Sequence, residues 1–259
     1  MTDGPNPLAA ATSMLRARRV SRPAPTRGTR VDHDALVPVL DALESRGINS
    51  LLDNQPALDQ YRDHLMQLSP DEMSPAEALA YWLNLYNAGA LRRAATALES
   101  DTGSVFRIPG AFTDVWATVD GEALSLDDIE HGKIRRFGDP RVHAALVCGS
   151  VSCPTLRYEP FDGAQLDAQL DQQMRVFLES GGAALDRTTN TLKLSRIFLW
   201  YGRDFTHPES MPELLPASTP RLRNTVAWWL DEDDQQYVWE NGPTVEFLAY
   251  DWGLACSIA

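Results

Sequence analysis

The chain has 259 residues, of which 44% are hydrophobic and 23% are charged, so it has the composition of a globular protein and the length to bury a substantial core. Its net charge of −13 argues against nucleic-acid binding by the body of the protein, and no apolar run reaches the roughly 18 residues that a membrane span requires. Three cysteines and a start without an apolar secretory segment argue against a secreted disulfide scaffold, so we expect a cytoplasmic protein.

Residues 1–30 differ in composition from the rest of the chain. They carry six arginines and one aspartate, are rich in proline, and show little apolar periodicity. We expect a mobile arm there, because such a segment has little apolar surface to bury. Residues 31–259 contain no internal repeat and no convincing linker, and we expect them to form a single globular domain.

Two amphipathic helices are predicted at the start of that domain. Apolar residues repeat at helical spacing in two stripes, and Gly47 ends the first one. The stripes consist of Leu36, Val39, Leu40 and Leu43, and of Leu58, Tyr61, Leu65 and Leu68.

The strongest helix signal covers residues 74–100. Ser74, Pro75 and Glu77 are the N-cap, first-turn proline and acid of a capping box. The segment is apolar over much of its circumference, which predicts a central helix. Asn84 and Asn87 lie three residues apart within it, and an amide in a helix interior needs a partner. Either the two amides bond a neighbouring loop, or Asn87 orients a side chain at a site.

Residues 115–126 are predicted to form a β-hairpin around an Asp-Gly turn, followed by a helix over 126–136 that Ser125 caps. Glu130 interrupts an apolar row of that helix, and His131 follows at its edge. A carboxylate in such a row is costly unless it is paired or hydrogen-bonded. Glu130 therefore either forms an ion pair with an arginine or belongs to a site with His131.

Two cysteines stand five residues apart in "VHAALVCGSVSCPTLRYEP". Residues 142–148 read as a buried strand of small and branched residues, which would place His143 and Cys148 on opposite faces. Cys153 follows a Gly-Ser-Val-Ser turn and precedes Pro154, a residue favoured at the first position of a helix. The segment is compatible with a thiol site, half of a metal site, a disulfide, or a core strand and its turn.

The remaining chain completes a mixed fold. A helix is predicted within 162–182, a strand or buried loop over 191–205, a helix over 219–230 with Thr219 as its cap, and a final strand over 244–254. We expect an α+β (mixed) fold in a single domain. Its central apolar helix would pack on a small, mostly antiparallel sheet and be surrounded by amphipathic helices.

Six segments in this order closely resemble one family: "YWLNLYNA", "SLDDIEHGKIR", "HAALVCGSVSCPTLR", "LDAQLDQQMRVFL", "WYGRDF" and "YDWGL". The family is catalogued as domain of unknown function 547 and occurs in bacteria, archaea and plants. The resemblance covers roughly residues 70–254, and the family name assigns no activity. It implies that motif positions are occupied by Asn87, Glu130, His131, His143, Cys148, Cys153, Pro154, Tyr201, Asp204 and Asp251. The chain departs from the family at its end, where Ala255 and Cys256 stand in place of the usual Leu-Asn.

These residues support a cysteine- and histidine-dependent hydrolase or acyl-transfer enzyme that acts on a small molecule or peptide. Cys153 would be the nucleophile, activated by a helix N-terminus, and His131 the base, oriented by Glu130 or Asn87. The turn before Cys153 would offer N–H groups to an oxyanion. We assign no cofactor and no metal to this site. The expected binding residues are Cys148, Ser152, His143, Tyr201 and Asp204.

Two other classes of function remain open. A non-catalytic binding or scaffold module would keep both cysteines as small core residues. A metal-binding protein would use His131, His143, Cys148 and Cys153, although the chain has no Cys-x-x-Cys motif. A disulfide between Cys148 and Cys153 is sterically conceivable but disfavoured in a reducing cytosol.

Overall fold

The computed structural model describes residues 11–12, 15, 30–208 and 216–258. Apart from residues 11–12, 15 and 30, the predicted arm lies outside them. The α+β prediction is confirmed. The α-helices are α2 (Val37–Arg46), α3 (Leu51–Leu65), α4 (Pro75–Glu99), α5 (Val142–Ala145), α6 (Leu166–Phe177), α7 (Arg196–Trp200), α8 (Gly202–Thr206), α9 (Thr219–Val226) and α10 (Glu232–Asn241). The strands are β1 (Val115–Val119), β2 (Glu122–Ser125), β3 (Ala183–Asp186), β4 (Thr191–Leu194) and β5 (Thr244–Phe247).

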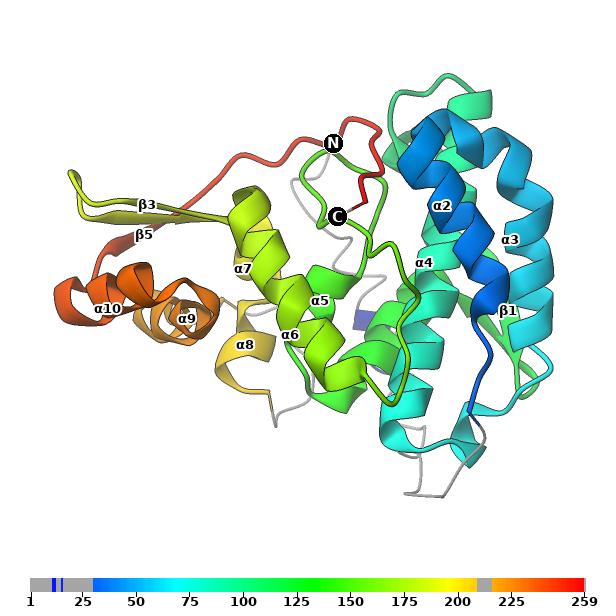
Figure 1. The fold of residues 1–259 in the computed structure, drawn as a ribbon, viewed down its shortest axis with the longest axis horizontal. Coiled ribbons are helices and arrows are strands. Elements are labelled where there is room, and N and C mark those ends of the chain that lie inside the picture. Colours follow the sequence, from blue (N-terminus) through cyan, green and yellow to red (C-terminus); the bar gives the residue numbers. More distant parts are fainter. Residues whose placement is uncertain (1–10, 13–14, 16–29, 209–215, 259) are drawn as a thin grey trace.

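Helix α4 lies at the centre of the helical part of the molecule, with α2 and α3 on one side and α6 on the other (Figure 1). Ser74 caps it as predicted, because its hydroxyl accepts the backbone N–H of Glu77 at 3.2 Å. The Glu77 carboxylate does not complete the capping box. It accepts the backbone N–H of Val31 at 2.6 Å and so holds the start of the described domain against α4.

The hairpin β1–β2 is antiparallel as predicted. Its turn residues Asp120 and Gly121 both have positive φ, 49° and 78°, as a two-residue hairpin turn requires. At its end the Ser125 hydroxyl accepts the N–H of Asp128, whose carboxylate accepts the N–H of Ser125 in return. This capping pair starts the π-helical segment Asp128–Lys133, which a 3₁₀ turn, Ile134–Phe137, continues. The predicted helix is therefore present but irregular, and π-helical segments occur often at functional sites.

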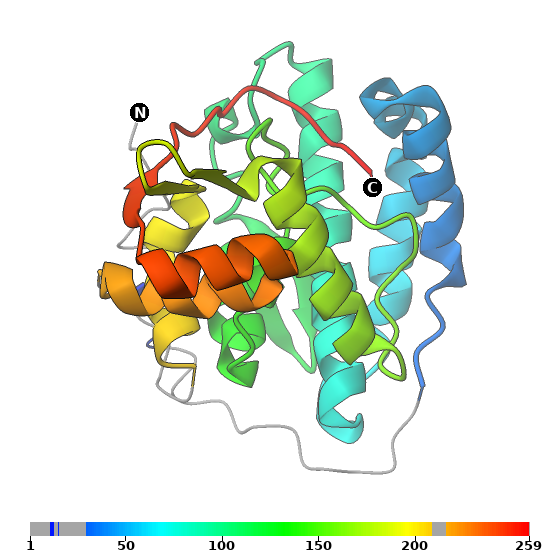
Figure 2. The same ribbon diagram turned by 60° about the vertical axis from the view of Figure 1, so that its left-hand side comes forward.

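A second, separate sheet lies at the other end of the molecule, with α9 and α10 beside it (Figure 2). In it β3 pairs with β4 antiparallel and β4 pairs with β5 parallel. The prediction of one small sheet is therefore replaced by two sheets. The hairpin packs in a first hydrophobic cluster together with α2, α3 and α4, and the second sheet packs in a second cluster that contains Leu192 and Leu194. The strand predicted over 191–205 ends at Leu194 and gives way to α7 and α8, and Ser218, not Thr219, is the cap residue of α9.

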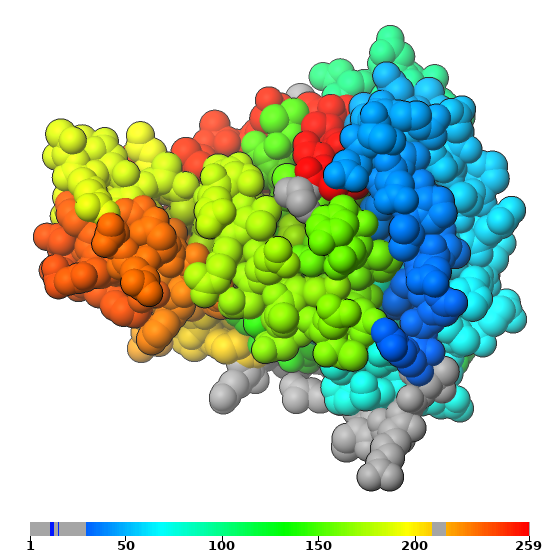
Figure 3. Space-filling model, viewed as in Figure 1, coloured from blue at the N-terminus to red at the C-terminus, as the bar shows by residue number. Residues whose placement is uncertain are grey.

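The predicted final strand ends at Phe247, and the chain then runs back across the molecule towards α2 and α3 (red in Figures 1 and 3). Backbone bonds anchor this return segment to the cysteine region: Val151 N–H donates to Gly253 at 2.9 Å, and Leu156 N–H donates to Ser257 at 2.7 Å. Cys256 packs against the hydrophobic cluster that contains α2, α3 and α4. The return segment thereby carries residues 250–252 over the region between the two clusters.

Candidate functional site

A cavity of about 290 Å³ lies between the two hydrophobic clusters. Its walls come from α4, the loop before β1, the π-helical segment with Asp127, the chain from α5 to Pro154, α7, and residues 250–252. This volume is at the small end of the range for ligand sites, about 300–1,000 Å³, and fits a metabolite-sized molecule. Seven of the lining residues are aromatic, and the others include both cysteines, two histidines and two carboxylates.

The strand predicted over 142–148 is wrong. Residues 142–145 form the short helix α5, and residues 146–148 continue in extended form without pairing in a sheet. A short run of small and branched residues fits a buried helical turn as well as a strand, so periodicity alone does not separate the two. The predicted separation of His143 and Cys148 therefore does not hold, and both line the cavity.

The two asparagines of α4 hold neighbouring loops. Asn87 donates to Ala145 O at 2.9 Å and accepts the Val147 N–H at 3.1 Å. Asn84 makes the same pair of bonds with the backbone of Phe161. Asn87 therefore positions the chain that leads to Cys148, and its amide contacts this backbone rather than His131.

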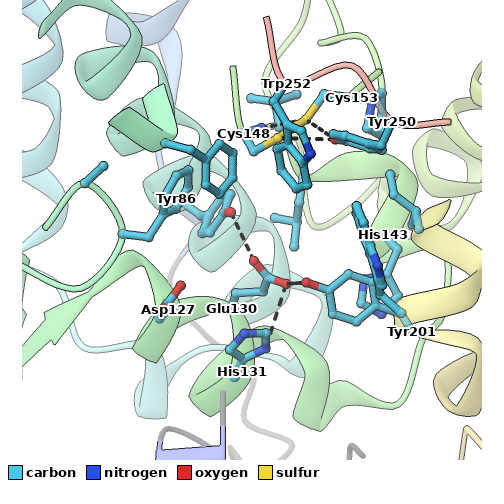
Figure 4. A pocket seen from close by; sticks show the side chains of 18 of the residues that line it. Tyr86, Asp127, Glu130, His131, His143, Cys148, Cys153, Tyr201, Tyr250 and Trp252 are labelled. Carbon is cyan, nitrogen blue, oxygen red and sulfur yellow. Dashed lines mark hydrogen bonds and ion pairs between the residues drawn. A yellow bond between two sulfur atoms is a disulfide. The ribbon is translucent and has the colours of Figure 1, made fainter. Parts of the chain in front are cut away.

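Glu130 lies at the floor of the cavity and is hydrogen-bonded by two tyrosines (Figure 4). Tyr201 donates to Oε1 at 2.7 Å and Tyr86 donates to Oε2 at 3.0 Å. Burial opposes ionisation of Glu130, but the hydrogen bond from Tyr201 and the positive charge of Arg135 lower its pKa below the usual value. The predicted arginine ion pair is absent from the described contacts, and tyrosine hydroxyls hold the carboxylate instead.

His131 is buried beside Glu130, and Arg135 fixes its protonation. Arg135 Nη1 lies 3.2 Å from His131 Nδ1. A guanidinium can only donate, so Nδ1 accepts and the proton of the imidazole is on Nε2. Burial lowers the pKa of His131 to about 4, in agreement with a neutral ring.

Arg135 and His143 share the carboxylate of Asp204. Arg135 donates to it through Nε at 2.7 Å and Nη2 at 2.8 Å, and His143 Nε2 lies 2.8 Å from the same group. Burial opposes ionisation of Asp204, but these hydrogen bonds lower its pKa to about 2. The His143 ring also stacks on Tyr201, with centroids 4.1 Å apart. Asp204 thus supports the floor from behind, since it does not itself line the cavity.

Asp127 is a lining residue that the sequence reasoning missed. Burial, followed by the negative charges of Glu130 and Asp128, raises its pKa to about 7. A carboxyl group that titrates near neutral pH is suited to acid–base catalysis. The signal available in the sequence was the spacing of Asp127 and Glu130, three residues apart and hence on one face of a helical segment.

The Cys148 and Cys153 sulfurs are joined as a disulfide, contrary to the expectation of free thiols. Both residues are half-buried. No helix begins at Pro154, and Cys153 therefore does not lie at a helix N-terminus. Tyr250 Oη is 3.4 Å from the Cys148 sulfur and 3.2 Å from the Cys153 sulfur.

Three N–H groups of the segment from Gly149 to Cys153, which was predicted to bind an oxyanion, are already bonded within the protein: Val151 to Gly253, Ser152 to Asp251, and Cys153 to Ser150. These three are therefore not available as oxyanion donors. The Ser152 hydroxyl accepts the N–H of Asp251 at 2.9 Å and so anchors the return segment outside the cavity.

An aromatic cluster forms the wall beside the sulfurs. The Trp252 ring lies 4.3 Å from Tyr250 and 4.5 Å from Phe106, and it stacks on Trp200 at 5.5 Å, all between centroids. Phe106 is 41% exposed, so this wall reaches the surface. Within the described residues, no group of three or more His, Cys, Asp and Glu side chains is arranged to hold a metal ion. The positions of the described side chains therefore give the metal-binding alternative no support.

Fold and site together define an α+β protein with a cavity that has a carboxylate floor, an aromatic wall and a disulfide. Residues 70–178 match the family model described as "Protein of unknown function, DUF547", which confirms the family resemblance over that segment. No curated protein and no solved structure matches the chain. The match contains the floor and both cysteines, whereas α7 and residues 250–252 lie beyond it. In the described part of the chain no helix is long and apolar enough to cross a membrane.

Proposed function

We propose that the cavity is the active site of a thiol-dependent hydrolase or acyl-transfer enzyme, with Cys153 as its nucleophile once the disulfide is reduced. One observation carries the proposal: the Cys153 sulfur lies 3.0 Å from the Cys148 backbone nitrogen and 3.2 Å from the Tyr250 hydroxyl, in the wall of a cavity that also holds the side chains of Asp127 and Glu130. The backbone N–H is a donor directed at this sulfur, and the Tyr250 hydroxyl is able to donate to it as well; donors at a sulfur favour its thiolate form.

The two cysteines differ in a way that supports Cys153 as the reactive one. Cys148 Sγ lies 3.3 Å from the Ser150 hydroxyl, which can accept the proton of a Cys148 thiol once the disulfide is reduced. Cys153 instead receives a backbone N–H, which cannot accept a proton in return. Reduction by an external dithiol would break the S–S bond and oxidise the dithiol, leaving Cys153 as the preferred thiolate and Cys148 as the thiol.

The chemistry then needs a proton donor near neutral pH, and Asp127 suits that role. The Cys153 thiolate attacks a substrate carbonyl carbon and forms a thioester, while the leaving group departs with the proton of the Asp127 carboxyl group. Water or an acceptor alcohol or amine then attacks the thioester, its proton passes to the Asp127 carboxylate, and the thiolate is released. Ionised Glu130 and neutral His131 form the polar floor opposite the sulfurs (Figure 4).

The test is acylation of the reduced protein by p-nitrophenyl acetate, read by release of nitrophenolate and by peptide mass spectrometry. We expect an acetyl group on Cys153, with the same burst in Cys148→Ser and none in Cys153→Ser. Acetylation spread equally over Cys148, Cys153 and Cys256, or no burst above that of Cys153→Ser, would contradict the proposal.

A non-catalytic ligand-binding role is the second candidate, and the disulfide is the observation that favours it. In the oxidised form neither sulfur is a nucleophile, while the cavity and its aromatic wall remain. Ligand binding that is unchanged by reduction, together with no acyl transfer, would favour this role.

A further inference from the structure

The cavity is lined by carboxyl groups and by no lysine or arginine among the described residues. The carboxyl groups are those of Asp127 and Glu130. Arg135 is a buried cation that contacts the floor residue His131 from outside the lining; it is bonded to Asp204 and lies over the Tyr201 ring, 5.0 Å from its centroid. The floor therefore carries negative charge that faces the cavity without a cation in the lining.

Glu130 in particular has only neutral hydrogen-bond donors among its described contacts. They are the hydroxyls of Tyr86 and Tyr201. Its contact with His131 is 3.8 Å long and involves Nδ1, the nitrogen that accepts from Arg135 and carries no proton. An ionised carboxylate in a buried, weakly screened position attracts a ligand cation more strongly than it would in water.

The wall of the cavity adds a second source of attraction for a cation. Trp200, Tyr250 and Trp252 line it together, with Phe106 at its outer edge. The face of an aromatic ring carries partial negative charge, and tryptophan and tyrosine bind ammonium groups most strongly. Carboxylates on one side and aromatic rings on the other make an environment suited to an organic cation rather than to an anion.

We propose that the cavity takes substrates with a positively charged alkylammonium group. The inference rests on the proposed function in that it names the substrate class of the same site. The ammonium group lies between the Glu130 carboxylate of the floor and the aromatic wall, and Asp127 adds to the negative charge in its ionised form. The disulfide is on the opposite side of the cavity from Glu130 and His131 (Figure 4), so the acyl part of such a substrate would face Cys153. An ester or amide of an ammonium-bearing alcohol, amine or amino acid has this arrangement.

The test compares choline with dimethylbutanol, in which carbon replaces the charged nitrogen, and with dimethylbutanoate, which is an anion of similar size. Titration calorimetry on the oxidised protein excludes thiol chemistry. We expect choline to bind at least about tenfold more tightly than dimethylbutanol, because only the cation gains from the carboxylates and ring faces. Dimethylbutanoate should bind most weakly.

Variants of the floor and wall residues test whether the preference for choline arises in this cavity. Glu130→Gln and Asp127→Asn should each reduce the preference for choline over dimethylbutanol, and Trp252→Leu should weaken binding of choline. Trp239→Leu is the matched control, because Trp239 is 43% exposed on α10 and does not line the cavity. If Glu130→Gln does not fold, Asp127→Asn and Trp252→Leu still decide the question.

Equal binding of choline and dimethylbutanol, tighter binding of dimethylbutanoate, or no binding of choline would overturn the inference. These outcomes leave the proposed function standing if p-nitrophenyl acetate still acetylates Cys153. Conversely, selective binding of choline without acylation would overturn the thiol chemistry and retain the cation site.

Discussion

Asp127→Asn should make the protein more stable above neutral pH and leave it little changed in mild acid. The pKa of Asp127 is raised from 3.8 to about 7, chiefly by burial. The folded state therefore retains a proton that the unfolded chain has already lost, and the stability of the natural protein falls as pH rises from about 4 to about 7. Above pH 7 both states are ionised and this dependence ends. Asparagine has no proton to lose, so the variant lacks the decline.

The magnitude follows from the size of the pKa change. A displacement from 3.8 to about 7 corresponds to about 4 kcal/mol in full. Part of the Asp127 side chain reaches solvent, so we expect about 2 kcal/mol between pH 5 and pH 8. The assay is urea unfolding of the oxidised natural protein and variant across this range. Asp41→Asn, at an exposed position of α2, is the control. If the stability difference for Asp127→Asn is the same at every pH, the inference of a raised pKa fails.

Three substitutions test the supports of the cavity by urea unfolding. Asn87→Ala should lower the free energy of unfolding by about 2–4 kcal/mol, because it leaves two buried backbone groups unpaired; a change below about 0.5 kcal/mol would refute this. Arg135→Met should lower the free energy of unfolding by about 3–5 kcal/mol, because it removes the cation bonded to the buried Asp204 carboxylate. Adding Asp204→Asn should restore part of that stability, and no restoration would contradict the pairing. Gly89→Ala should lower the free energy of unfolding by about 1–3 kcal/mol, because its Cβ would lie 2.5 Å from Leu126 Cδ2 and 2.8 Å from Trp116 Nε1. A neutral result would contradict this packing argument.

The helical half of the molecule could be predicted from local pattern because its signals are local. The stripe that ends at Gly47 forms α2, and Ser74 begins α4 as its capping position indicates. The turn of the hairpin needs two residues with positive φ, and an Asp-Gly pair in the sequence indicates such a turn because these residue types adopt positive φ readily. These elements are specified by residues within a few positions of one another, so one sequence is sufficient to identify them.

The cavity could be predicted only in part, because its walls come from distant segments. Glu130 stood out as a carboxylate in an apolar row, but its tyrosine partners lie 44 and 71 residues away along the chain. The raised pKa of Asp127 depends on burial, which the fold creates. Residues 250–252 reach the site because the chain turns back after β5, and no local pattern indicates that return.

The cysteine region was misread for two separate reasons. The run from Val142 was predicted as a buried strand because its residues are small and branched, whereas the bonds from Asn87 to Ala145 and Val147 hold a helical turn followed by non-helical chain. The disulfide was disfavoured by an argument about compartment, but the closeness of two sulfurs is set by the turn between Cys148 and Cys153.

The rate of Cys153 alkylation by iodoacetamide in the reduced protein, followed against pH by peptide mass spectrometry, tests the central claim most directly. Cys256 is an internal control, because burial raises its pKa to about 12. We expect Cys153 to react far faster than Cys256 and to reach half its maximal rate below the ordinary thiol value of about 8.5. A Cys153 that reacts only after denaturant is added, or whose half-maximal rate lies above that value, would contradict a thiol-dependent active site.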